Sequence, residues 1–338
     1  MIRRRRFGRA EVRIPEIGLG CYNLTADRGV DRDTALATLQ RAYELGARFF
    51  DTAPMYGDGE CDELLGLAFG HLDADEVLIG AKLSGPPGER LGDYRRDSVL
   101  RVFDRTLRAL RRDEVFALQV HGFASPRDIP RQSAEWRAMY APGMAFEALL
   151  ELKEQGACRY IGATNHNSVF LAEAVRRFPL DVVEIASHYN ITSHVAPLTL
   201  LPLTEERGVA TVIANPIGGG RLVSLETYRA ATYLGALPLD EAVGILERLM
   251  RDTGLALYEL ALLYLLHDPR VTCVIPGPRN VAELEADVGV ADRPPLSDEQ
   301  AAELARIGSR MLARKVPTES DVEVVGVPLR PEWLATTT

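Results

Sequence analysis

The chain has 338 residues, of which 46% are hydrophobic and 26% charged, and its formal net charge is −9. This composition is typical of a globular protein with a sizeable core, and the acidic balance argues against nucleic acid as a partner, which would need a basic face. No apolar stretch approaches the roughly 20 residues of a membrane span, so no membrane partner is expected, and no apolar segment follows the basic N-terminus as in a secretion signal. The four cysteines form no CxxC pair, which favours reduced thiols in a cytoplasmic protein.

The first elements are a hairpin and a helix. Residues 3–13 are predicted to form the hairpin, and its basic run, Arg3 to Arg6, is interpreted as a solvated strand or arm. In "RDTALATLQRAYELGA" apolar residues recur at the 3.6-residue period until Gly46, a stop signal, which predicts a helix. The same apolar periodicity predicts helices over residues 59–70, 94–112, 143–155, 167–177, 196–207, 240–266, 279–290 and 298–314.

Short apolar runs alternate with these helices. They read "IGLG", "ARFFDT", "EVLIGAK", "VFALQVHG", "RYIGATN", "DVVEIAS", "VATVIANP" and "VTCVIPG". Uniformly apolar runs of this length are typical of parallel strands covered on both faces, and eight strands close a barrel. An open doubly wound sheet is the alternative, but "GLGCYNL" lacks the GxGxxG spacing that such a sheet usually carries. The prediction is a single domain over residues 1–338 of the α/β class, a (β/α)8 TIM barrel with an N-terminal β-hairpin and an extra C-terminal helix.

Titratable residues lie at the ends of three consecutive strands. Asp51, Lys82 and His121 end the second, third and fourth strands, and Tyr56 follows in the loop after Asp51. Strand ends converge at one face of a barrel, so these groups are expected to meet. Tyr56 would transfer a proton, the ammonium of Lys82 would lower its pKa, Asp51 would hold Lys82, and His121 would orient a substrate oxygen.

Each of these residues also has a structural interpretation. A strand-end aspartate is often a helix cap, a lysine is usually a solvated tip, and a histidine in "QVHG" could be a core residue. The combination is more restrictive than any single member.

The chain resembles the aldo-keto reductases in "IGLGCYNL", "FFDTAPMYGDGECDELLG", "IGAK", "LQVHG", "RYIGATNHN", "VIANPIGGG" and "VIPGPRNVAELEAD". The resemblance implies a TIM barrel, a nicotinamide cofactor bound without a Rossmann domain, and a catalytic tetrad of Asp51, Tyr56, Lys82 and His121. Two stretches, "DYRRDSVLRVFDRTLRAL" and "MAFEALLELKEQGACRYIGATN", are most similar to the branch with bacterial aldose 1-dehydrogenases and pyridoxal dehydrogenase.

The same resemblance implies a set of cofactor-binding residues. The nicotinamide end would contact Gly20, Cys21 and Tyr22, with Asp51 nearby, and its carboxamide would be held by Thr164 and Asn165. Small residues let backbone amides approach an anion, so the pyrophosphate would lie under the "NPIGGG" loop, with Asn215, Pro216, Ile217 and Gly218. The adenosine end would meet Gly277, Arg279, Glu283 and Asp287.

Three departures from the family pattern bear on the cofactor. Glu184 or Ala186 stands where the family commonly has a glutamine, and Ala214 or Asn215 where an aromatic residue stacks on nicotinamide, so Tyr189 is a candidate substitute. Glu283 would repel a 2′-phosphate, whereas Arg279 could pair with one. On balance NAD is expected, with NADP as the alternative.

Other features carry alternatives. His166, His188 and His194 show no metal-binding spacing, so no metal site is expected. Glu283 and Asp287 could be a solvated surface pair, and the segment 122–142, with Trp136 and Tyr140, could shape the substrate pocket or form a packed flap.

The expected function is NAD(P)-dependent hydride transfer involving a small-molecule carbonyl, alcohol or sugar lactol, with Tyr56 as general acid/base. The alternatives are a cofactor-binding regulatory subunit and a metal-dependent barrel hydrolase. The sequence leaves the exact substrate, the direction and the oligomeric state open.

Overall fold

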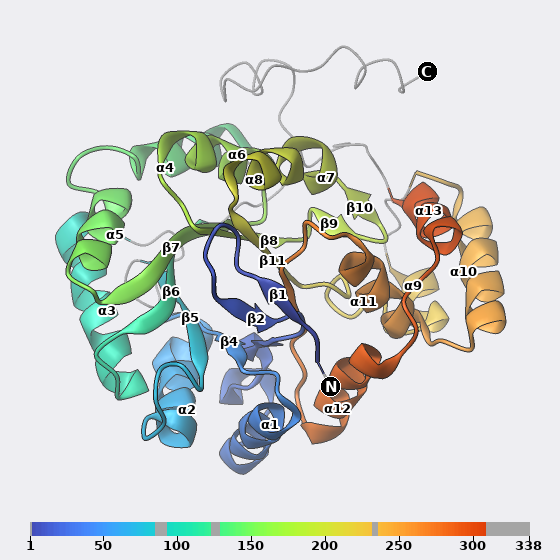
Figure 1. The fold of residues 1–338 in the computed structure, drawn as a ribbon, viewed down its shortest axis with the longest axis horizontal. Coiled ribbons are helices and arrows are strands. Elements are labelled where there is room, and N and C mark those ends of the chain that lie inside the picture. Colours follow the sequence, from blue (N-terminus) through green and yellow to red (C-terminus); the bar gives the residue numbers. More distant parts are fainter. Residues whose placement is uncertain (1, 85–92, 123–128, 232–235, 309–338) are drawn as a thin grey trace.

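The computed structural model describes residues 2–84, 93–122, 129–231 and 236–308. Eight strands form one parallel sheet in the order β12-β11-β8-β7-β6-β5-β4-β3 (Figure 1). They are β3 (Leu19–Gly20), β4 (Phe49–Asp51), β5 (Leu78–Leu83), β6 (Val115–His121), β7 (Cys158–Asn165), β8 (Val182–Ala186), β11 (Ala210–Ala214) and β12 (Cys273–Ile275).

The sheet closes between its first and last strands. Ile17 forms a parallel bridge with Val274, and the Gly18 amide donates to the Val274 carbonyl at 2.9 Å. One step further along, the Gly20 amide donates to the Pro276 carbonyl at 2.8 Å. The predicted (β/α)8 barrel is confirmed.

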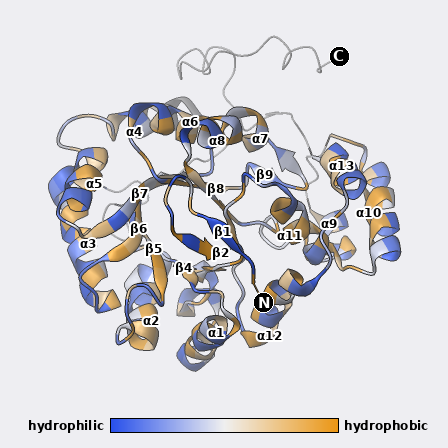
Figure 2. Cartoon of the chain, viewed as in Figure 1, coloured by the Kyte–Doolittle hydropathy of each residue, from blue (hydrophilic) through white to orange (hydrophobic). Residues whose placement is uncertain are grey.

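Helices surround the barrel (Figure 1). The longer ones are α1 (Arg32–Leu45), α2 (Glu60–Phe69), α3 (Arg96–Leu110), α4 (Ile129–Ala138), α5 (Ala145–Glu154), α6 (Ser168–Arg177), α10 (Leu239–Thr253), α11 (Leu257–His267), α12 (Val281–Gly289) and α13 (Asp298–Ile307). Local signals set their ends: Asp31 caps α1 by accepting from the Thr34 amide, and α1 stops at Gly46, whose φ is 88°. These outer helices carry both hydrophobic and hydrophilic residues, as expected for one buried and one solvated face (Figure 2).

Two predicted helices are each divided in the structure. The predicted helix 240–266 is α10 and α11, because Gly254 at φ 70° turns the chain between them. The predicted helix 196–207 is α7 (Ala196–Thr199) and α8 (Leu201–Arg207), separated at Leu200. Among the described residues, elements that were not predicted include α4, α9 (Leu225–Ala230) and the small hairpin of β9 (Tyr189–Asn190) and β10 (Ser193–His194). Residues 309–314 of the predicted last helix lie outside the described residues.

The barrel interior is apolar toward the amino-terminal ends of the strands. The N-terminal hairpin, β1 (Arg4–Arg6) and β2 (Arg13–Pro15), contributes Phe7 and Ile14 to a buried cluster inside the barrel. Phe7 packs edge-on against Phe116, with ring centroids 5.0 Å apart, and Phe49 reaches the same ring. The hairpin therefore closes the amino-terminal end of the barrel, opposite the strand ends that carry the predicted chemistry.

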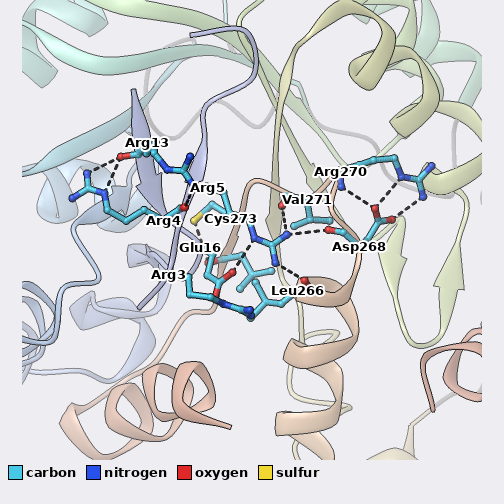
Figure 3. Close-up of polar contacts among 11 residues, drawn as sticks. Arg3, Arg4, Arg5, Arg13, Glu16, Leu266, Asp268, Arg270, Val271 and Cys273 are labelled. Carbon is cyan, nitrogen blue, oxygen red and sulfur yellow. Dashed lines mark hydrogen bonds and ion pairs between the residues drawn. The ribbon is translucent and has the colours of Figure 1, made fainter. Parts of the chain in front are cut away.

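The basic run at the N-terminus is more than a solvated strand. Arg4 and Arg6 are exposed, as predicted, but Arg5 turns inward and pairs with the buried Glu16 at 2.9 Å. Its guanidinium also donates to the carbonyls of Asp268 at 3.0 Å, Val271 at 2.8 Å and Leu266 (Figure 3). The expectation of a solvated arm is thus wrong for Arg5, which links the hairpin to the end of α11 and the segment before β12.

Among the described residues, none of the helices combines the length and the apolar character needed to span a membrane. All four cysteines are buried and free.

Replacing Arg5 by methionine should destabilise the protein. The change leaves Glu16 with Arg3 as its ion-pair partner among the described residues and removes the donor to three carbonyls, so the free energy of unfolding should fall by about 3 kcal/mol. Urea denaturation measures this difference. Arg4→Met is the matched control, because Arg4 is exposed on the same strand and should change the stability by no more than about 0.5 kcal/mol. Equal losses in the two variants would contradict the linking role of Arg5.

Candidate active site at the carboxyl ends of the strands

Above the apolar layer, polar side chains occupy the barrel interior. The register places Lys82 of β5 beside Gln119 of β6, His121 beside Thr164 of β7, and Thr164 beside Glu184 of β8. Alternate residues of a strand share a face, so Gln119 and His121 point to the same side of β6. All five side chains are buried.

A buried lysine links three strands in this polar layer. The Nζ atom of Lys82 pairs with Oδ1 of Asp51, at the end of β4, and with Oε2 of Glu184 at 2.8 Å. The side chain of Lys82 is 0% exposed, and those of Asp51 and Glu184 are 3% and 4% exposed. Two predicted catalytic residues, Asp51 and Lys82, are therefore in contact, and Glu184 is a second carboxylate on the same ammonium.

Neutral donors complete the shell around Glu184. The Gln119 side-chain amide donates to Oε2 of Glu184 at 3.0 Å, and the Thr164 hydroxyl donates to Oε1 at 3.2 Å. Burial acts to raise the pKa of Glu184, but the ammonium of Lys82 outweighs it and holds that pKa below its ordinary value. Glu184 is therefore a carboxylate at neutral pH.

Tyr56 lies on a tight turn after β4. Its amide donates to the Ala53 carbonyl at 2.9 Å, and the next three residues, Gly57, Asp58 and Gly59, all have positive φ. A Cβ atom at Gly57 would approach the Thr25 side chain to 2.7 Å, so glycine lets the turn pack against the first loop. The aspartate, proline and glycines of "DTAPMYGDGE" thus present a tyrosine at the strand ends.

The ring of Tyr56 lies between two aromatic neighbours. Its centroid is 6.4 Å from that of His121 and 5.1 Å from that of Tyr22, both in edge-on geometry. Tyr22 is 43% exposed and lies beneath the guanidinium of Arg28, whose carbon is 4.1 Å from the ring centre. The half-buried Tyr56 is therefore adjacent to His121, one of its predicted partners.

The electrostatics around Tyr56 differ from the prediction. Burial raises the pKa of the Tyr56 phenol well above its ordinary value, and the charge of Glu184 raises it further. The predicted lowering of this pKa by Lys82 is not found, because burial and the charge of Glu184 dominate the pKa of Tyr56. Burial, followed by the charge of Lys82, lowers the pKa of His121 to about 3, so this imidazole is neutral at physiological pH.

The predicted cofactor residues of the first strand lie beside the end of β12. Gly20 ends β3, and Asn23 in the following turn donates to the Gly277 carbonyl at 2.6 Å. Cys21 is fully buried, and its sulfur lies 3.8 Å from the Leu19 carbonyl. The thiol of Cys21 is thus part of the core, whereas Tyr22 faces the strand ends.

Thr164 and Asn165 end β7 and are both buried. The hydroxyl of Thr164 is engaged with Glu184. Asn165 accepts a hydrogen bond from the Asn167 amide at 2.8 Å, while its own side-chain nitrogen has no hydrogen-bond partner among the described residues.

The loop after β11 is shaped by a run of left-handed residues. Asn215 has φ 53°, and Gly218, Gly219 and Gly220 have φ values of 63°, 67° and 86°. The Asn215 side chain accepts from the Gly219 amide and donates to the Ser187 hydroxyl at 3.4 Å. Pro216 is buried, whereas Ile217 and Gly218 are half-buried, so the loop presents mainly backbone and small side chains.

The predicted adenosine end is formed by the start of α12. The Arg279 guanidinium pairs with Glu283 at 2.9 Å, and the Arg279 amide donates to the same carboxylate at 2.9 Å. Asp287 is 7% exposed, and burial, followed by the charge of Glu283, raises its pKa to about 7. The alternative of a solvated Glu283–Asp287 pair is therefore wrong for Asp287.

Tyr189 does not replace the missing aromatic residue. Its hydroxyl donates to Asp268 at 2.8 Å, and its ring packs against His194 and Tyr264. Asp268 lies next to the Arg5 contacts at the amino-terminal end of the barrel, so the suggestion that Tyr189 stacks on nicotinamide is wrong.

The three histidines that were considered as metal ligands each have a hydrogen-bonding neighbour. His188 accepts from the Ser168 amide at 3.2 Å, His194 contacts the Tyr264 hydroxyl at 2.9 Å, and His166 lies 3.3 Å from the Ser187 hydroxyl. Within the described ranges, no group of three or more His, Cys, Asp or Glu side chains is arranged to hold a metal ion.

The two described aromatic residues of the segment 122–142, Trp136 and Tyr140, pack against neighbouring helices. Trp136 is 2% exposed and donates to the Phe170 carbonyl at 3.0 Å, and Tyr140 packs edge-on against Phe146. This favours a packed flap for α4; residues 123–128 lie outside the described residues.

Gln119 was not predicted from the sequence as a residue of this site. It stands two residues before His121 on a strand that was predicted, so strand alternation could have placed it in the same layer. Glu184 was noted as a departure from the family pattern, but its contact with Lys82 joins segments 102 residues apart and leaves no local signal.

The buried neutral His121 should make the protein less stable in acid. Below pH 6.5 an unfolded histidine takes up a proton, whereas native His121 does so only near pH 3, so stability falls as pH falls through this window. The loss approaches about 1.4 kcal/mol per pH unit for this residue. Unfolding free energies of wild type and His121→Gln from pH 7 to 4 should converge at the acid end, with the exposed-histidine variant His71→Gln as control. Parallel pH curves for wild type and His121→Gln would refute this.

Comparisons with known proteins agree with this arrangement. A sequence model of the Aldo/keto reductase family matches residues 16–309. The chain is 29% identical to pyridoxal 4-dehydrogenase from Microbacterium luteolum, over 65% of this chain and 72% of that protein. It is 28% identical to D-threo-aldose 1-dehydrogenase from a Pseudomonas species, over 81% of this chain and 88% of that protein.

A solved structure supports the fold. The holo form of an aldo-keto reductase from Bacillus halodurans superposes with a TM-score of 0.73 at 22% identity, covering 94% of this chain and 100% of that one. The family match covers most of the chain, so this protein belongs to the aldo/keto reductase family and is an oxidoreductase.

Proposed function

We propose that this protein transfers a hydride between NAD or NADP and a small-molecule alcohol, sugar lactol or carbonyl, with Tyr56 as the general acid/base. The observation that carries the proposal is the position of Tyr56, whose ring lies beside His121 at the strand ends that hold the Lys82–Asp51 pair. Proton transfer needs a hydroxyl within reach of the substrate oxygen. The active sites of barrel enzymes lie at the carboxyl ends of the strands, where Tyr56 is found.

Each residue of the tetrad has a role that its environment supports. Tyr56 keeps its proton in the ligand-free protein because its pKa is raised, so it is ready to donate to a carbonyl oxygen. His121 is neutral, so it orients that oxygen by a hydrogen bond without competing for the proton. Lys82, held by Asp51 and Glu184, is the cation of the same strand ends and would offset negative charge that develops on the substrate or on Tyr56 during proton transfer.

The residues at the strand ends suit a nicotinamide cofactor, which would supply or accept the hydride when bound. The buried side-chain nitrogen of Asn165 has no partner among the described residues and could donate to a carboxamide oxygen. The run Gly218 to Gly220 has no side chains that would obstruct an anion such as a pyrophosphate, although the Gly218 and Gly219 amides already donate to Asn215. Gly20, Tyr22 and Gly277 lie together at the junction of β3 and β12.

The dehydrogenases among the relatives favour an alcohol or sugar lactol as the reduced substrate. The intact tetrad and the family assignment support this function over a regulatory subunit or a metal-dependent hydrolase. Four buried free thiols suit the reducing cytoplasm as the site of action.

Tyr56→Phe should abolish turnover and leave cofactor binding nearly unchanged. The substitution removes the hydroxyl that transfers the proton and keeps the ring contacts with His121 and Tyr22, so kcat should fall at least 100-fold. The assay follows the absorbance of reduced nicotinamide with a panel of aldehydes, sugars and pyridoxal, and titration calorimetry measures the Kd of the cofactor.

Tyr43→Phe is the control for this experiment. Tyr43 lies on α1 with its hydroxyl 3.2 Å from Glu76, away from the tetrad, so its loss should leave kcat within about twofold. A Tyr56→Phe enzyme with most of the wild-type activity would rule out the acid/base role.

The Arg279–Glu283 pair supports NAD as the preferred cofactor. Glu283 already neutralises the one guanidinium at the start of α12 that could bind a 2′-phosphate, and its own charge repels that group. Glu283→Arg should therefore raise kcat/KM for NADP relative to NAD by about tenfold or more. Glu285→Arg is the matched control, since Glu285 lies on the same helix but pairs with Arg41 at 2.7 Å. A cofactor ratio unchanged in Glu283→Arg would overturn the preference.

A further inference from the structure

The polar layer at the strand ends contains one more negative than positive charge. Asp51 and Glu184 both pair with the ammonium of Lys82, and one ammonium compensates one carboxylate. The remaining partners of Glu184, Gln119 and Thr164, are neutral hydrogen-bond donors. Among the described residues of this layer, no second cation offsets the additional carboxylate.

Neighbouring titratable groups do not remove this imbalance. His121 is neutral at physiological pH because burial lowers its pKa to about 3. The thiol of Cys21 also stays neutral, because burial raises its pKa well above the ordinary value. Glu184 itself is stabilised as a carboxylate by Lys82 and by its two hydrogen bonds.

This excess of negative charge lies where the nicotinamide end of a cofactor would bind. Thr164, one of the residues expected at the carboxamide, donates directly to Glu184. The charge of Glu184 also reaches Tyr56, where it adds to burial in raising the pKa of the phenol. Charges in a buried layer are poorly screened, so an uncompensated carboxylate acts over several ångströms there.

We propose that Glu184 gives this site a preference for the oxidised nicotinamide, whose ring is positively charged, over the reduced nicotinamide, whose ring is neutral. This inference rests on the proposed function, and it adds which redox state of the cofactor the protein binds more tightly. An attractive charge that acts on one ring and not on the other changes the ratio of the two dissociation constants.

A purely structural role for Glu184 makes a different prediction. If Glu184 served only to hold Lys82 or Thr164 in place, its loss would weaken the oxidised and reduced cofactors alike. Asp51 remains on Lys82 when Glu184 is neutralised, so the ammonium keeps one partner. The ratio of the two dissociation constants therefore separates the electrostatic role from the structural one.

The experiment compares two neutral variants with a charge-retaining one. Glu184→Gln keeps the size and hydrogen-bonding capacity of the side chain, Glu184→Met keeps its length, and Glu184→Asp keeps its charge. Asp181→Asn is the matched control, because Asp181 is a buried carboxylate next to the opposite end of β8, where it accepts from the Ile161 amide at 3.0 Å. Titration calorimetry gives the Kd of each variant for NAD⁺, NADH, NADP⁺ and NADPH, and thermal unfolding verifies that each is folded.

In both neutral variants, binding of the oxidised form should weaken about tenfold relative to the reduced form, which corresponds to about 1.4 kcal/mol. Glu184→Asp and Asp181→Asn should keep the wild-type ratio. A ratio within twofold of wild type in every folded neutral variant, or an equal shift in Asp181→Asn, would overturn the proposal. Failure of the wild type to bind any of the four cofactors would instead remove the proposed function, and this inference with it.

Discussion

The buried ammonium of Lys82 is the constraint on which the upper half of the barrel depends. A charge with a fully buried side chain is costly unless oppositely charged groups contact it, and its two carboxylates come from β4 and β8. These partners must converge from strands on both sides of β5, so the ion cluster fixes how the strand ends face one another. The apolar layer beneath it, closed by Phe7 of the hairpin, keeps the cluster away from water at the opposite end.

Three further contacts hold the tyrosine loop above this cluster. Asp62 of α2 accepts from the Thr52 hydroxyl at 2.7 Å and from the Thr106 hydroxyl at 2.9 Å, which ties the start of the loop to α2 and α3. Gly57 packs against Thr25, so the loop is also fixed from the side of β3. Tyr56 is therefore positioned by backbone turns and by anchors outside the barrel, while burial and, after it, the charge of Glu184 raise the pKa of its phenol.

Local patterns in the sequence predicted most of the fold, because covered parallel strands and capped helices have local signatures. The apolar runs located all eight strands, and the four predicted tetrad residues lie at their ends or in the following loop. The division at Gly254 was missed because the apolar periodicity continues on both sides of a single left-handed glycine. The inward turn of Arg5 was missed for another reason: its carbonyl partners lie more than 260 residues away, beyond any periodic pattern.

The two ends of the predicted cofactor site differ in electrostatic balance. At the start of α12, Arg279 and Glu283 neutralise each other on the surface, where water also screens them. At the strand ends, two buried carboxylates share the one ammonium of Lys82, and the other partners of Glu184 are neutral, so the charge of this cluster is screened far less by water. The two proposals thus assign discrimination between phosphorylated and unphosphorylated cofactor to α12, and discrimination between oxidised and reduced cofactor to β8. Because these groups share no contact, a change at one end should leave the selectivity at the other end intact.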